Sequence, residues 1–342
     1  MKIQELFDSP VMRLPLDRDD EDLEQYLAKI FGSYLNTIKA LDARDHLCAR
    51  IQAAESEISQ LGDWIQTAVR RYLGGSPGAA YTEILKGINF VYPRLRELQS
   101  LDIDSKDVGR LYRVADAKAK PANRERLFHA PFHLRHKVGQ HRYGIPGFPC
   151  LYLGGSLELC LAECRIDSSV VPGVAIAEFA FRKTVKILDF GYRPAVLADQ
   201  AGRLSKKVAG SNAPLEKFII DYAVSWPLIA AASIGVLHDG DPFVPEYIVP
   251  QMILQWIMSS NECEGLRYFS TRFRPPSLRA ELNYVFPAKH GGGPQTGYSQ
   301  ELKDAFELTE PIIWGPTTSG NLSQDAKDRE QALNAMTKAP IS

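Results

Sequence analysis

The sequence lacks the features that mark membrane and exported proteins. Its N-terminus, Met1-Lys2-Ile3-Gln4, has no basic segment followed by an apolar one, and no run of about 18 apolar residues occurs in the chain. The five cysteines are few and odd in number for 342 residues, which favours free thiols in a reducing compartment over a disulfide framework. We therefore expect a soluble cytoplasmic protein with no membrane partner.

An excess of charge of either sign is also missing. The chain has 40 Lys and Arg residues against 41 Asp and Glu residues, so no global field attracts nucleic acid or an anionic membrane. No Gly-x-Gly-x-x-Gly sequence opens a helix, and neither a P-loop nor a His-Glu-x-x-His sequence occurs. Histidines crowd the stretch from His129 to His141, but without an enclosing cysteine pattern we expect a solvated loop and no metal site. Direct nucleic-acid binding and a Rossmann-type site are therefore not expected.

Apolar residues at steps of three and four predict an all-α region over residues 1–100. The first helix begins near Asp20, the second spans 45–73 and ends at the breaker Gly74–Gly78, and the third spans 81–98. These helices have no concentrated basic face, which argues against a DNA-binding helix-turn-helix. Their long apolar stripes favour packing, dimerisation or partner binding, and we expect a homo-oligomer.

After residue 100 the pattern changes to short strands mixed with helices. The expected strands cover 109–114, 150–153, 174–181, 185–189, 266–273 and 284–287, and the expected helices cover 157–165, 214–232 and 246–259. The strands at 174–181 and 185–189 look like a hairpin. Without a regular βαβ rhythm, the pattern predicts an α+β sheet domain over 101–315. The polar tail, 316–342, is expected to be loosely ordered.

Three polar residues occur where an apolar frame would not favour them. Arg113 alternates with Leu111 on a strand, Glu163 falls within the apolar arc of a helix that begins at Ser156, and Ser270 lies in a strand. Arginine holds phosphate bidentately, and a carboxylate can stabilise positive charge on a ribose ring. The trio predicts a site for a phosphorylated, sugar-containing ligand. A structural alternative stays open, in which Arg113 and Glu163 form a buried ion pair and Ser270 only packs.

Five short motifs, in this order, resemble the RES domain family, which is named after an arginine, a glutamate and a serine. They are Leu111-Tyr112-Arg113-Val114, then His141-Arg142-Tyr143-Gly144 before Pro149-Cys150-Leu151-Tyr152-Leu153, then Leu161-Ala162-Glu163, Tyr247-Ile248-Val249-Pro250-Gln251 and Gly265-Leu266-Arg267-Tyr268-Phe269-Ser270. The resemblance covers residues 108–314. It implies an ADP-ribosyltransferase-like mixed sheet domain preceded by the all-α region.

The resemblance also implies a function. It indicates a bacterial toxin, the usual neighbour of an Xre-type antitoxin, that depletes NAD by hydrolysis or phosphorolysis, with NAD as substrate and no separate cofactor. In such a protein Arg113 would grip the phosphates or ribose of NAD. Glu163 would stabilise the oxocarbenium-like centre as nicotinamide leaves, and Ser270 would orient Glu163 or the ribose.

Further contacts follow from the same resemblance. Tyr143 and Tyr152 are candidates to stack on a ring of NAD, although both could equally be core residues, and Arg142 could reach a second phosphate or lie in solvent. Gly144 stands where many members have asparagine, so a contact from that position is not expected. Two alternatives stay open: an ADP-ribosyltransferase that modifies a protein, and a non-catalytic module that binds NAD or ADP-ribose.

Overall fold

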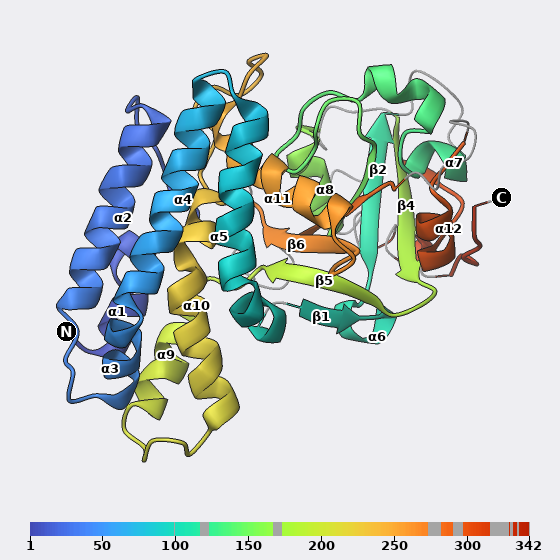
Figure 1. Ribbon diagram of the computed structural model, residues 1–342. Helices are drawn as coiled ribbons and strands as arrows, with labels where there is room; N and C mark the ends of the chain where they lie inside the picture. Colours follow the sequence, from blue (N-terminus) through green and yellow to red (C-terminus); the bar gives the residue numbers. More distant parts are fainter. Residues whose placement is uncertain are drawn as a thin grey trace. The chain divides into compact units, whose positions relative to one another are not determined.

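The chain forms two compact units in a computed structural model (Figure 1). The structure describes residues 1–98, 100–116, 123–166, 173–272, 282–289, 297–314, 328, 331–333 and 335–341. The helical unit contains residues 1–100 and 189–256, and the sheet unit contains residues 101–188 and 257–342. The helices followed by a mixed sheet confirm the predicted α+β class.

The helical unit is built around long amphipathic helices that lie side by side (Figure 1). Its helices are α1 (Ile3–Phe7), η1 (Pro10–Met12), α2 (Leu23–Lys39), α3 (His46–Ala53), α4 (Glu55–Leu73), α5 (Pro77–Leu98), α9 (Pro194–Leu204), α10 (Ala213–Ala231), η3 (Pro245–Tyr247) and α11 (Ile248–Ser259), which crosses the boundary between the units. Asp22 and Asp45 cap α2 and α3 by accepting backbone N–H groups. The predicted second helix is divided into α3 and α4, because Ala54 leaves helical geometry.

Helix α10 supplies the core on which the N-terminal helices pack. Almost all of its residues from Ile219 onward are buried, on every side of the helix. Pro227 within α10 cannot donate a backbone hydrogen bond to the carbonyl of Ala223, and the Tyr34 hydroxyl of α2 donates to that carbonyl instead, at 2.7 Å. The rings of Tyr34 and Trp226 also pack, with centroids 4.3 Å apart.

This packing changes the expected division of the chain. The prediction placed residues 189–256 in the catalytic domain, whereas the structure places them with the first hundred residues. The physical reason is the apolar stripes of α2 and α4, which α10 covers within the same unit. Sequence spacing showed that these stripes needed a partner but could not show that the partner lies far along the chain.

The sheet unit contains nine strands among the described residues. The bounds are β1 (Ser100–Ile103), β2 (Leu111–Asp116), β3 (Cys150–Gly154), β4 (Val174–Phe181), β5 (Val185–Phe190), β6 (Gly265–Phe269), β7 (Leu282–Pro287), β8 (Phe306–Leu308) and β9 (Ile312–Trp314). The strand order is β1-β5-β6-β7-β3-β2-β4-β8, and β9 also pairs with β4. Its helices are α6 (Ser105–Val108), α7 (Arg124–Leu127), η2 (Phe132–Lys137), α8 (Leu157–Glu163) and α12 (Gln300–Ala305).

Two expectations about this unit are wrong. Strands β4 and β5 do not form a hairpin, because β2 occupies one edge of β4 while β8 and β9 share the other, which leaves no edge for β5. The described part of the C-terminal tail is packed rather than loose. Leu333 is buried beside α8, Ala339 pairs with Leu308, and the Lys338 ammonium lies 2.7 Å from the buried Glu178 carboxylate.

His129 is a buried residue of the sheet unit, so the expectation of a solvated loop is wrong for this histidine. Its side chain is 0% exposed; Nε2 accepts a hydrogen bond from the backbone N–H of Ser299 at 2.8 Å, and Nδ1 lies 2.8 Å from the carbonyl of Ala130. Nδ1 must therefore carry the proton of a neutral imidazole. Burial lowers the pKa of His129 to about 4.

The lowered pKa of His129 predicts acid sensitivity. The unfolded chain takes up this proton near pH 6.5 and the folded chain only near pH 4, so stability is present above pH 6.5 and is lost as the pH falls through that window. The loss is on the order of 3 kcal/mol. We expect His129→Gln to flatten the dependence of Tm on pH between 6.5 and 4, measured by thermal unfolding. His136→Gln, at an exposed position, should keep the wild-type slope; equal slopes for both variants would contradict this role.

Candidate functional site

Helix α8 brings Glu163 to the sheet. Its N-cap, Ser156, accepts a hydrogen bond from the backbone N–H of Leu159 at 3.1 Å, and its apolar face packs against β2. The Cys160 thiol donates to the carbonyl of Tyr112 on β2 at 3.2 Å. Glu163 is the last residue of the helix. The helix is therefore anchored to β2 at Tyr112, the residue just before Arg113.

A glycine at the end of β3 allows this close approach. A Cβ atom built on Gly154 would lie 2.6 Å from the sulfur of Cys160, closer than real Cβ contacts come. With the Cys160 sulfur in its observed place, the helix could not keep this position over a larger residue. Gly154 thus determines where Glu163 lies, although it is nine residues away in the chain.

The Glu163 carboxylate is held through one of its two oxygens. Oε1 accepts a hydrogen bond from the Ser270 hydroxyl and another from the Asn283 amide, each at 2.7 Å. The Ser270 oxygen itself accepts from the backbone N–H of Arg272 at 3.1 Å, so its proton is directed to Glu163. Within the described residues no group donates to Oε2. Oε1 is thus the oxygen of Glu163 that the described residues hold.

Arg113 is a cation that pairs with no carboxylate among the described residues. It lies on β2, partly buried, and its Nη1 is enclosed without a hydrogen-bond partner among the described residues. Its electrostatic neighbours are thiols and a phenol, led by Cys164 and Cys160, and burial lowers the pKa of the guanidinium. The ion pair with Glu163 that the sequence left open does not form between these two described residues. An enclosed, unpaired guanidinium favours an anionic ligand.

Arg113 and Glu163 both influence the pKa of the Cys160 thiol. Burial raises the pKa of this thiol, Glu163 raises it further, and Arg113 lowers it. A positive and a negative group therefore both lie within electrostatic reach of one buried sulfur without neutralising each other.

The segment from His141 to Gly144 packs against β6 and the residues that follow it, where Ser270 lies just beyond the strand and not inside it as predicted. Arg142 is buried and donates to the Thr271 hydroxyl at 2.9 Å. Tyr143 is 1% exposed, and its ring centroid lies 4.6 Å from that of Tyr268. Burial raises the pKa of the Tyr143 hydroxyl. These contacts assign both side chains a packing role, and ligand contacts for Arg142 and Tyr143 stay predictions.

Tyr152 on β3 is more accessible than Tyr143. It is partly buried, and its ring meets the ring of His141 edge-on, with centroids 5.6 Å apart. A Cβ on Gly144 would lie 2.7 Å from the Tyr152 hydroxyl. The glycine that departs from the family pattern thus leaves room for this hydroxyl. Stacking of Tyr152 on a ring of NAD stays a prediction.

Asn283 is the site residue that sequence reasoning missed. It is 7% exposed on β7, where it pairs with Gly154 of β3 and Tyr268 of β6. The signal was available, since Asn283 is a polar residue within the otherwise apolar run 282–287. It resembles the pattern that singled out Ser270.

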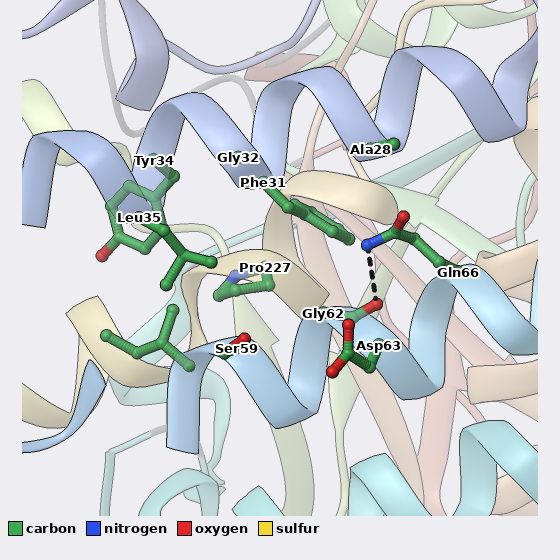
Figure 2. Close-up of a pocket in the computed structure, with 11 residues that line it drawn as sticks. Ala28, Phe31, Gly32, Tyr34, Leu35, Ser59, Gly62, Asp63, Gln66 and Pro227 are labelled. Atoms are coloured by element: carbon green, nitrogen blue, oxygen red, sulfur yellow. Dashed lines mark hydrogen bonds between the residues drawn. The ribbon is translucent and has the colours of Figure 1, made fainter. Parts of the chain in front are cut away.

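A cavity elsewhere in the chain does not suit the predicted ligand. It has a volume of about 150 Å³ and lies in the helical unit between α2, α4 and Pro227 of α10 (Figure 2). Polar groups reach it from Ser59, Asp63 and Gln66, and the described residues that line it include no cation. A phosphate would meet the carboxylate of Asp63 there without a positive charge. The cavity and the Glu163 cluster are in different units.

The described residues lack two features of other classes of protein. None of the helices there combines the length and apolar character needed to cross a membrane. Groups of three or more His, Cys, Asp or Glu residues that could hold a metal ion are likewise absent from this part of the chain.

Comparison with known proteins identifies the family. The model of the RES domain matches residues 110–295, more than half of the chain, and the chain therefore belongs to the RES domain family. It is also similar to a protein of Bacillus subtilis (strain 168) named "Putative toxin YopC", with 27% identity over 316 residues that cover 88% of this chain and 68% of the relative. No solved structure gives a significant match. All three residues of the trio lie within the matched range.

The contact between Gly154 and Cys160 predicts a coupled pair of substitutions. Gly154→Ala should lower Tm by several degrees, because its Cβ would collide with the sulfur at 2.6 Å. Cys160→Ala alone should cost about 1 kcal/mol, through the lost hydrogen bond and buried sulfur. In the double variant the collision is removed, so it should be more stable than the sum of the two single effects indicates. Additive changes in a double-mutant cycle of unfolding free energies would contradict the contact.

Proposed function

We propose that this protein is a RES-type toxin that cleaves the bond between nicotinamide and ribose in NAD. Membership of the RES family and the name of the Bacillus subtilis relative support the toxin class. The observation that carries the chemistry is a carboxylate that accepts hydrogen bonds from described residues at one oxygen only, in the same unit as an enclosed guanidinium that has no carboxylate partner among those residues. NAD contains both an anion and a ribose that becomes positively charged on cleavage.

In this proposal Arg113 binds the diphosphate of NAD. A guanidinium presents parallel N–H groups that match two phosphate oxygens, and the partly buried position of Arg113 strengthens that attraction. Binding would also satisfy Nη1, which no described protein group does. The binding energy thus positions the ribose relative to Glu163.

Glu163 acts on the bond that breaks. Nicotinamide leaves with the electron pair of the bond to the ribose carbon, and positive charge spreads over that carbon and the ring oxygen. Oε2 of Glu163 stabilises this charge. Water then bonds to the carbon and loses a proton, which gives ADP-ribose; attack by phosphate gives the phosphorylated sugar instead. Ser270 keeps Glu163 in the required orientation.

The partners of the protein are a further part of the proposal. Resemblance to the family suggests an Xre-type antitoxin, and the apolar stripes of the N-terminal helices suggested a homo-oligomer. The helical unit still exposes large apolar side chains, among them Leu73, Phe90 and Phe243. We propose this unit as the part that binds a neutralising partner or a second copy, since the chemistry is assigned to the sheet unit.

Replacement of Glu163 tests the chemistry. Purified protein is incubated with NAD, with and without phosphate, and the products are separated by chromatography. We expect nicotinamide release, and Glu163→Gln should reduce kcat on the order of a hundredfold, because it removes the charge that matters most in the transition state. NAD binding should change little. Glu158→Gln, on the exposed side of the same helix, is the matched control. Turnover of Glu163→Gln within a few fold of wild type would contradict the role.

Replacement of Arg113 separates binding from stability. Arg113→Lys should weaken NAD binding at least tenfold, because an ammonium cannot reproduce the bidentate contact. Arg113→Met should abolish binding and leave Tm unchanged or raise it, since the guanidinium is enclosed without an ionic partner among the described residues. Calorimetric titration in the Glu163→Gln background avoids turnover. Arg110→Lys, just before β2, serves as the control. A large fall in Tm with wild-type binding would show that Arg113 is structural.

A further inference from the structure

Asn283, on β7, and Ser270, just after β6, hold the same oxygen of Glu163. The Asn283 amide donates to Oε1 at 2.7 Å from β7, and the Ser270 hydroxyl donates at the same distance from the end of β6. Strand β7 is an interior strand between β6 and β3, so the backbone that carries Asn283 is fixed on both edges. The amide is 7% exposed. It is therefore a rigid donor rather than a mobile surface group.

Two donors on one oxygen restrict the carboxylate in a way that one donor cannot. A single hydrogen bond leaves the carboxylate free to rotate about its own axis and to exchange the two oxygens. Donors from two separate segments fix the plane of the group and keep Oε1 occupied. Only Oε2 is then presented to a ligand.

The donors are neutral, which matters for the reaction. A lysine or arginine at either position would also fix Glu163, but it would cancel the negative charge that the developing ribose cation needs. An amide and a hydroxyl orient the carboxylate without adding a positive charge. Neutral donors thus orient the Glu163 carboxylate without neutralising its charge.

We infer that Asn283 is a positioning residue for Glu163, which holds Oε1 so that Oε2 faces the reacting ribose. The inference rests on the proposed cleavage of NAD. Asn283 acts through Glu163 and makes no contact with the substrate.

The test replaces Asn283 by its nearly isosteric acid. In Asn283→Asp the donor becomes a second carboxyl group beside Oε1, and two carboxylates at this distance share a proton near neutral pH. We expect kcat for NAD at pH 7 to fall at least tenfold, with KM changed less than threefold. The acid limb of the kcat profile should move up by at least one pH unit, because Glu163 is ionised only at higher pH. Asn283→Ala should lower kcat by a similar factor without this shift.

Thermal unfolding gives a second measurement that does not involve NAD. The shared proton raises the pKa of the carboxyl pair in the folded state above its unfolded value, so its contribution to stability is lost as the pH rises. The Tm of Asn283→Asp should therefore fall further below wild type between pH 5 and pH 8. Asn212→Asp makes the same chemical change at the N-cap of α10, where an aspartate serves equally well, and should alter neither profile.

The outcomes distinguish this inference from the proposed function. If wild-type protein cleaves NAD while Asn283→Asp and Asn283→Ala both keep its kcat and acid limb, the inference is overturned and the proposed function stands. If wild-type protein leaves NAD intact, the proposed function fails and the catalytic part of the inference fails with it. In that case a Tm of Asn283→Asp that still falls with pH would support the contact with Glu163 alone.

Discussion

The close approach of α8 to the sheet is the constraint on which the rest of the site depends. Gly154 has no side chain to keep the helix away, and Cys160 uses the resulting space to bond to the carbonyl of Tyr112. The helix ends at Glu163, so its position sets the position of the carboxylate. Ser270 and Asn283 complete the arrangement, but they could not reach a carboxylate delivered by a helix that lay farther from β3.

Charge separation is the second organising feature. Folded proteins usually neutralise a partly buried guanidinium with a carboxylate. Here the sheet unit contains Arg113 and Glu163, and the two side chains form no ion pair with each other. Glu163 is satisfied by neutral donors, and Arg113 is surrounded by neutral thiols and a phenol. In the proposed function, an anionic ligand offsets the cost of enclosing a cation that no described carboxylate pairs. Such unpaired charge is typical of a binding site rather than of a core.

Some of the site residues could be predicted from the sequence and others could not, for physical reasons. Alternation on β2 and the arc of α8 singled out Arg113 and Glu163 because a charged residue on an apolar frame is a local pattern. The contact between Ser270 and Glu163 depended on the family resemblance, since 107 positions separate them. Asn283 was missed because one amide in a short strand is a weak signal without its partner. The packing of α10 and the separation of β4 from β5 are long-range choices, which local spacing does not encode.

The interleaved order of the two units has a consequence for synthesis of the chain. The helical unit is completed only after residues 189–256 have been made, and the sheet unit is interrupted by that segment. Arg113 and Glu163 leave the ribosome early, whereas both donors to Glu163 come from β7 and the end of β6, beyond the interruption. A nascent chain that carries the cation and the carboxylate therefore lacks the two donors that orient the carboxylate. The site is assembled late in translation, when the remaining strands join the sheet, and a prematurely terminated product does not contain it.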